Sequence, residues 1–275
     1  MSETFTQPMM NRPGVPQVSL LTVTSNSPVA RQVYRMTLKG DGVQAMVEPG
    51  QFVHIKCGSS ASPLLRRPLS ICDVDRKKRE LTIIYRVEGE GTRYLSTLQS
   101  EDMVDVLGPL GNGFPLGNRD KADRVLIVGG GVGVPPLYYL SKCLSKRGAR
   151  VTHILGFNSQ EDSFLTDDFH QLGETYVTTM DGSLGHKGIV TDIMAHWPPE
   201  SWQAVYACGP LPMLKAIEQH MAGAYQTEVY LSLERRMGCG IGACLACVCH
   251  TPDSAISYKK VCTDGPVFKL GEVIL

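Results

Sequence analysis

The chain has 275 residues, of which 43% are hydrophobic, enough for two domains with their own cores and a small third module. Basic and acidic residues each total 27, so the formal net charge is zero and nothing favours nucleic-acid binding. Because no apolar run reaches about 18 residues, we expect no membrane span. Residues 1–17 contain prolines but no apolar signal-peptide core, so we expect a flexible N-terminus and a cytoplasmic protein.

Short β-rich runs separated by turns occupy the first half of the chain. They cover residues 18–25, 33–38, 52–57, 69–73, 80–87 and 103–108. Runs at this spacing are typical of an antiparallel barrel or sandwich. The only helix expected here covers residues 92–99. We assign residues 18–117 to this all-β domain.

Two loops of the β domain have chemistry suited to a phosphate. In the first, Arg67 follows another arginine and precedes Pro68, Leu69 and Ser70. A guanidinium fork beside a hydroxyl suits a pyrophosphate, although two arginines at a strand start are more often a solvated edge. In the second, Gly91 and Thr92 open the helix, where free N–H groups bind anions and Thr92 is the expected cap. Simple helix capping explains this second loop equally well.

From residue 124 strands and helices alternate. Strands are expected over 125–128, 151–157, 176–179 and 204–208, with helices over 135–146, 166–172, 189–196 and 211–221. This alternation predicts a parallel α/β sheet, with ligands at the carboxyl ends of its strands. We assign residues 118–226 to this domain.

A glycine-rich turn joins the first strand of this domain to its helix. Its glycines are Gly129, Gly130, Gly131 and Gly133, and they would let a diphosphate approach the backbone. Val134 in the last position breaks the usual G-x-G-x-x-G pattern. Carboxylates at 161 and 162, after the next strand, favour NAD over NADP, which needs an arginine.

The last strand of the alternating series ends in Cys208, Gly209 and Pro210. From chemistry alone, Cys208 either lies beside the nicotinamide or fills a small buried space.

Four cysteines near the C-terminus follow the spacing C-x4-C-x2-C-x14-C, namely Cys239, Cys244, Cys247 and Cys262. This is the plant-type [2Fe–2S] spacing, and a glycine-rich first loop fits zinc or a disulfide pair less well. Cys249 alternates with Cys247, so we interpret it as structural. We assign residues 227–275 to a cluster module that begins with a strand over 230–234.

The chain resembles the ferredoxin–NADP reductase superfamily in four segments, namely Arg67-Pro-Leu-Ser70, Gly91-Thr92, 129–136 and Cys208-Gly-Pro210. With the cysteines added, the chain from residue 18 onward resembles the electron-transfer subunits of bacterial class 1B dihydroorotate dehydrogenases. The resemblance implies a multi-domain protein with an FAD-binding antiparallel β-barrel, a nicotinamide-binding α/β domain and a [2Fe–2S] module. It implies that FAD is held by Arg67, Pro68, Leu69, Ser70, Ile84, Tyr85, Arg86, Gly91 and Thr92, and the cluster by the four cysteines. The superfamily usually has an aromatic residue where this chain has Leu69.

The cofactor set implies an electron path. NAD exchanges hydride and the cluster exchanges single electrons, so a flavin must connect them. The resemblance implies that electrons come from the FMN of a catalytic partner subunit, in a heterotetramer with two copies of each chain. No acid–base site for dihydroorotate is visible in this sequence.

Two alternative functions remain at this point. One keeps the cofactors in a subunit of a hydrogenase, a sulfur reductase or a ferredoxin–NADP oxidoreductase. The other is a non-catalytic metal-binding scaffold.

Overall fold

The computed structural model describes residues 14–58, 63–118 and 123–275. The N-terminal segment expected to be flexible lies outside the described residues up to position 13, as do residues 119–122 of the expected interdomain link. No helix in the described part of the chain is long and apolar enough to cross a membrane.

Six antiparallel strands close into a barrel in the order β1-β2-β5-β4-β3-β6. They are β1 (Gln17–Ala30), β2 (Val33–Lys39), β3 (Phe52–Ile55), β4 (Arg67–Asp75), β5 (Glu80–Arg86) and β6 (Met103–Leu110). Inward-facing side chains alternate with outward ones, so Leu21, Met36, Ile71 and Ile83 share one buried core. The prediction of an antiparallel barrel is confirmed.

The α-helix of the barrel domain in the described part of the chain is α1 (Glu90–Thr97), which begins two residues earlier than predicted. Gly89 precedes it in an extended conformation and occupies the cap position. The Thr92 hydroxyl accepts hydrogen bonds from the backbone N–H groups of Glu88 (3.0 Å) and Gly89 (3.2 Å). The prediction that Thr92 is the cap is therefore wrong, because its hydroxyl reaches back to the cap from inside the first turn.

The second half forms a seven-stranded sheet in the order β10-β9-β8-β7-β11-β12-β15. Its elements are β7 (Arg124–Gly130), α2 (Pro135–Arg147), β8 (Arg150–Phe157), α3 (Thr166–His170), β9 (Glu174–Thr179), β10 (His186–Lys187), α4 (Val190–Met194), β11 (Ala204–Cys208), α5 (Leu211–His220), β12 (Glu228–Ser232) and β15 (Val267–Lys269). Neighbouring strands are parallel except β12 and β15. Side chains of α4 and α5 pack on one face, and those of α2 and α3 pack on the other. The predicted parallel α/β domain is confirmed.

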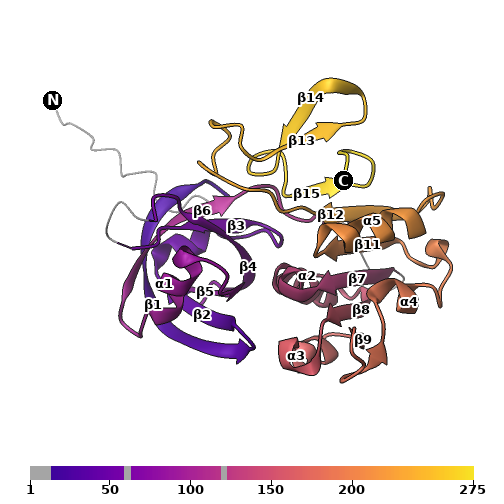
Figure 1. Ribbon diagram of the computed structural model, residues 1–275, viewed down its shortest axis with the longest axis horizontal. Helices are drawn as coiled ribbons and strands as arrows, with labels where there is room; N and C mark the ends of the chain where they lie inside the picture. Colours follow the sequence, from indigo (N-terminus) through magenta and orange to yellow (C-terminus); the bar gives the residue numbers. More distant parts are fainter. Residues whose placement is uncertain (1–13, 59–62, 119–122) are drawn as a thin grey trace.

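The C-terminal module combines a hairpin with an edge strand. The hairpin pairs β13 (Val248–Thr251) with β14 (Ser254–Lys260), and β15 returns to pair antiparallel with β12. The module thus adds two strands to the α/β sheet, which sequence spacing did not indicate. Figure 1 shows the barrel beside the sheet, with the yellow module above their junction.

Side chains also join the barrel to the α/β domain. Lys142 of α2 donates to both carboxylate oxygens of Asp73 in β4, at 2.7 and 2.6 Å. The Tyr206 hydroxyl of β11 donates to the Pro115 carbonyl at 2.7 Å. These contacts hold β4 against α2 and the segment after β6 against β11.

Candidate functional site

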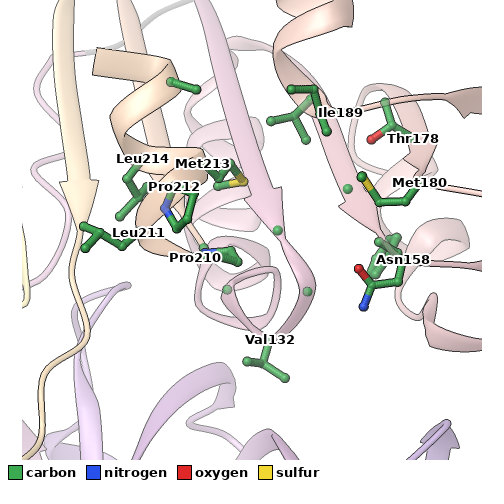
Figure 2. Close-up of a pocket in the computed structure, with 18 of the residues that line it drawn as sticks. Val132, Asn158, Thr178, Met180, Ile189, Pro210, Leu211, Pro212, Met213 and Leu214 are labelled. Carbon is green, nitrogen blue, oxygen red and sulfur yellow. The ribbon is translucent and has the colours of Figure 1, made fainter. Parts of the chain in front are cut away.

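A cavity of about 700 Å³ lies at the carboxyl ends of the parallel strands. Its wall is formed by the turns after β7, β8, β9, β11 and β12, as Figure 2 shows for Val132, Asn158, Met180 and Pro210. An open α/β sheet binds its ligands at this edge, because the loops there diverge. The size suits a dinucleotide.

Most of the glycines predicted to hold the dinucleotide line this cavity. Gly130, Gly131, Gly133, Gly209 and Pro210 are in its wall. Gly131 has φ of +53°, a left-handed conformation suited to glycine. A Cβ on Gly133 would lie 2.4 Å from the Cys208 carbonyl oxygen, so this turn packs directly on β11.

Two predicted residues, Gly129 and Cys208, lie just behind the wall. They form a paired register position between β7 and β11. A Cβ on Gly129 would lie 2.9 Å from the Val134 side chain, and Cys208 is 2% exposed. Burial, followed by the charge of Glu234, raises the pKa of the Cys208 thiol. The structure thus places the Cys208 side chain in the buried space that was one of its two interpretations.

Substituting Gly133 with alanine is expected to destabilise the protein by about 1–3 kcal/mol, the usual cost of overpacking. The added methyl group would press on the Cys208 carbonyl, which belongs to a strand and cannot move aside. Thermal unfolding and the KM for NADH measure the effect. Gly223→Ala is the control for the KM alone: its Cβ would meet nothing within 4 Å, but its φ of +90° disfavours alanine, so it should lower the Tm and leave the KM unchanged. An unchanged Tm and KM in Gly133→Ala would contradict this packing.

Charged residues from both domains face the same cavity, and sequence reasoning had assigned only one of them. Arg86 and Glu88 come from the barrel, whereas Glu234 and Arg235 follow β12. Burial raises the pKa of Glu234, and the neighbouring Glu88 raises it further. Glu88 and Glu234 are far apart in sequence, so no local pattern could have paired them.

One of the two carboxylates that favoured NAD over NADP is already engaged. Asp162 lines the cavity and receives two hydrogen bonds from Arg31 of the barrel, at 3.1 and 2.8 Å. Ser159 donates a third at 2.9 Å, and the Arg31 backbone N–H binds the Glu161 carbonyl. The β1–β2 hairpin is therefore held against the cavity rim. The sequence alone did not indicate this contact, because Arg31 and Asp162 are far apart in the chain.

Arg67 and Gly91, predicted from separate loops, meet at the barrel surface. A Cβ on Gly91 would lie 2.5 Å from the Arg67 Nε atom, so the guanidinium lies against the start of α1. Its hydrogen bonds go to the carbonyls of Leu65 and Arg66. By contrast, Arg66 forms a 2.9 Å ion pair with Asp105. Arg67 and the N-terminus of α1 thus form a cradle fit for a phosphate.

The other predicted flavin residues flank this cradle on two adjacent strands. Pro68, Leu69 and Ser70 lie in β4 and are half-buried, whereas Ile84 and Arg86 alternate with Tyr85 in β5. Tyr85 is 2% exposed and donates from its hydroxyl to Asn26 at 3.1 Å inside the barrel. Its side chain points away from the outer surface, so only its backbone is free for a flavin.

The four cysteines of the predicted cluster are brought together as two pairs. The Cys239 backbone N–H donates to the Cys244 sulfur, and the Cys244 N–H donates to the Cys239 sulfur, both at 3.4 Å. The Cys262 N–H donates to the Cys247 sulfur at 3.4 Å. Within the described ranges, no three His, Cys, Asp or Glu side chains converge as a single-ion site.

The loop chemistry suits thiolate ligands. Burial acts to raise the pKa of the Cys239 thiol, but backbone N–H groups of Ile241 and Cys244 outweigh it and lower the pKa to about 6. Gly240 and Gly242 have φ of +74° and +82°, which direct these groups inward. The thiolate is the form that binds iron. The residues present therefore fit an iron–sulfur cluster.

Cys249 is buried and lies outside both pairs. Its sulfur accepts a hydrogen bond from the Arg235 Nε atom at 3.4 Å. This contact agrees with a structural interpretation, since strand alternation turns Cys249 away from Cys247.

Residues 234–274 match the model of the iron–sulfur cluster binding domain of dihydroorotate dehydrogenase B, and this match includes all four cysteines. A Geobacillus sp. (strain WCH70) protein named dihydroorotate dehydrogenase B (NAD(+)), electron transfer subunit, is 56% identical over 255 residues. The alignment covers 93% of this chain and 98% of that protein. The chain belongs to this family of electron-transfer subunits. A Bacillus cereus (strain AH187) member of the same name is 52% identical over 258 residues, with the same coverage.

Solved structures of other reductases share the fold of this chain. An NADH-dependent reduced ferredoxin–NADP oxidoreductase structure, described for flavin-based electron bifurcation, is 31% identical with a TM-score of 0.81. That alignment covers 93% of this chain and 90% of the other. An Amycolatopsis cytochrome P450 reductase has a TM-score of 0.63 at 19% identity, over 78% and 70% of the chains, and shows the fold alone. The likenesses support an iron–sulfur cluster together with flavin and nicotinamide binding.

Proposed function

We propose that this chain is the electron-transfer subunit of an NAD+-dependent dihydroorotate dehydrogenase of pyrimidine biosynthesis. Electrons from dihydroorotate, oxidised on a catalytic partner subunit, reach NAD+ through this chain. The observation that carries the proposal is spatial: all three sites involve the barrel. Arg86 and Glu88 of the barrel line the dinucleotide cavity, the Arg67 cradle lies on the barrel, and the cysteine loop lies against His54 of β3. A bound flavin would exchange hydride with the nicotinamide and single electrons with the cluster.

The chain's own residues bind and orient in this scheme. Arg67 and the N–H groups at the start of α1 would hold the flavin phosphates, and the 129–133 turn would hold the dinucleotide. The Arg31–Asp162 clamp would keep the cavity rim against the barrel, so that both ligands meet across the interface. Nothing in this scheme requires an acid–base residue for dihydroorotate on this chain.

Three finer points belong to the same proposal. The cluster is of the [2Fe–2S] type, as the thiol spacing and the two pairs suggest. The partner carries FMN, and two copies of each chain assemble into a heterotetramer. We also propose that the cofactor-binding residues named from the sequence hold their cofactors, and that the domains meet near residues 117 and 226.

The visible spectrum of the purified chain tests the function. It is expected to show flavin and cluster bands that bleach with NADH, without turnover of dihydroorotate. Adding the catalytic subunit should give dihydroorotate-dependent reduction of NAD+. Turnover of dihydroorotate by the single chain would contradict the division of labour, and absence of flavin bands would favour a scaffold.

The tip of the cluster loop is the expected contact with the partner, because Ile241 and Leu245 are 58% and 48% exposed. Leu245→Glu is expected to slow transfer to the catalytic subunit about tenfold, since a charge would be desolvated there. NADH oxidation with an artificial dye should be unchanged. Tyr225→Glu, at a 97% exposed position after α5, is the control and should affect neither assay. If Leu245→Glu lowered the rates of both assays equally, the loop would be needed for folding and would not be a specific contact with the partner.

Nicotinamide preference is expected to depend on Asn158, which directly follows β8 and lines the cavity (Figure 2). Asn158→Arg should raise the ratio of kcat/KM for NADPH to that for NADH about tenfold, because a guanidinium fork there would bind a 2′-phosphate. Asn158→Gln is the uncharged control and should leave the ratio unchanged. A ratio that does not rise in Asn158→Arg would place the 2′-position elsewhere.

A further inference from the structure

His54 of β3 is a fully buried polar side chain that the proposed function does not use. It is 0% exposed, and neither ring nitrogen has a hydrogen bond of ordinary geometry within the described residues, although the backbone of Cys239 and of Arg66 lies beside the ring. Its imidazole faces the cysteine loop, since a Cβ on Gly240 would lie 2.7 Å from Nδ1. A fully buried imidazole that lacks a hydrogen bond of ordinary geometry calls for an explanation.

His54 lies between the strand proposed to hold the flavin and the loop that carries Cys239. Within the β3–β4 ladder, His54 is paired with Pro68, and its neighbours Val53 and Phe52 are paired with Leu69 and Ser70. The strand that carries His54 is therefore hydrogen-bonded to the strand proposed to hold the flavin. Its side chain reaches the loop that carries Cys239, so one residue lies between the two sites.

Asn112 makes a second contact between the barrel domain and a cysteine-bearing segment. Its backbone N–H donates to the Gly265 carbonyl at 2.7 Å. Its side-chain amide donates to the carbonyls of Thr263 (3.0 Å) and Asp264 (3.1 Å), directly after Cys262. Gln51, next to β3, supports this turn by donating to the Gly111 carbonyl at 3.1 Å. The barrel thus contacts both cysteine-bearing segments.

We propose that His54 and Asn112 are positioning residues, which hold the two cysteine-bearing segments against the flavin strand and so determine the separation and the environment of the cluster. His54 would donate its ring N–H to the backbone carbonyl of Cys239, which already lies beside the ring. Hydrogen bonding and solvent access around a cluster tune its potential. This inference rests on the proposed function.

The test compares His54→Leu, His54→Gln and Asn112→Ala in the cofactor-loaded protein. The readouts are the EPR spectrum of the reduced cluster, its midpoint potential, FAD content and the stopped-flow rate of cluster reduction after NADH is added. His54→Leu should shift the EPR spectrum and slow cluster reduction at least about tenfold, the size of effect typical of outer-shell changes. His54→Gln, which keeps a donor, should recover most of the rate. FAD content should not change.

A second buried histidine supplies the matched control. His153 of β8 is also 0% exposed, but it is partnered by Ser141 and Thr175, far from the cysteines in the sequence and on another sheet. His153→Leu should lower the Tm without altering the cluster signal. If His54→Leu does not fold, Asn112→Ala decides the question, because Asn112 is at the surface and should leave the fold intact.

The proposal is overturned if His54→Leu and Asn112→Ala leave the EPR spectrum and the reduction rate at wild-type values. It is also overturned if His153→Leu changes both as much as His54→Leu does. Failure of the proposed function is a separate result, since it would appear in the wild-type protein as missing cofactor bands or no coupling to the catalytic subunit.

Discussion

Replacing Cys262 with alanine is expected to eliminate the iron–sulfur cluster and electron transfer to the catalytic subunit. Cys262 is 2% exposed and pairs with Cys247, so no surface group or water can take its place. The loss in transfer should exceed the roughly 10- to 100-fold seen for changes outside the ligand shell. Iron content, the EPR signal and dihydroorotate-dependent NAD+ reduction measure it.

Cys249→Ala is the matched control, because this thiol is equally buried in the same module but contacts Arg235. It should retain iron and the EPR signal. Full iron content in Cys262→Ala, or loss of the cluster in Cys249→Ala alone, would show that the ligand set is wrong. NADH oxidation with a dye should persist in both variants, since the flavin and the dinucleotide cavity involve other residues.

Arg67→Ala is expected to weaken FAD binding by about 10- to 100-fold, because a charge-assisted hydrogen bond to phosphate contributes roughly 1.5–3 kcal/mol. The Arg67 guanidinium lies against Gly91 at the start of α1, and among the described residues its hydrogen bonds go to the carbonyls of Leu65 and Arg66. Its loss should therefore have little effect on the Tm of the flavin-free protein. Flavin content after gel filtration and titration of the flavin-free protein with FAD measure the affinity.

The adjacent Arg66 provides the contrast. It binds Asp105 and the His54 carbonyl, at 2.9 and 3.3 Å, in a half-buried position. Arg66→Ala should lower the Tm, because it leaves the Asp105 carboxylate without its partner. FAD affinity should be nearly unchanged. The reverse pattern, with Arg66 governing FAD affinity and Arg67 governing Tm, would contradict the assignment of the cradle.

The arrangement explains why the sheet extends into the cysteine module. β12 leaves the parallel sheet beside the dinucleotide cavity and leads directly to Cys239, and β15 returns to pair with β12 after Cys262. The Cys239 loop thus lies between β12 and His54 of the barrel, and the Cys262 segment lies between β15 and Asn112 of the barrel. A site held by such elements is more precise than one on a free loop.

Local chemistry was sufficient to predict several features from the sequence alone. Short strands with turns predicted the barrel, strand–helix alternation predicted the parallel sheet, and thiol spacing indicated the cluster. The strand-to-helix glycines also indicated a dinucleotide turn, which the cavity now contains at Gly130, Gly131 and Gly133. These predictions depend on residues close together in the chain, whose spacing directly reflects backbone geometry.

Only the tertiary structure decided the features that join distant segments. Three contacts each join residues more than 100 positions apart. Glu88 lies near Glu234, Arg31 binds Asp162, and His54 is buried against Gly240. Adjacent arginines 66 and 67 look equivalent in sequence, yet one is neutralised by Asp105 and the other lies against Gly91. Such contacts depend on which strands pair and how the domains pack, and a local pattern carries no record of either.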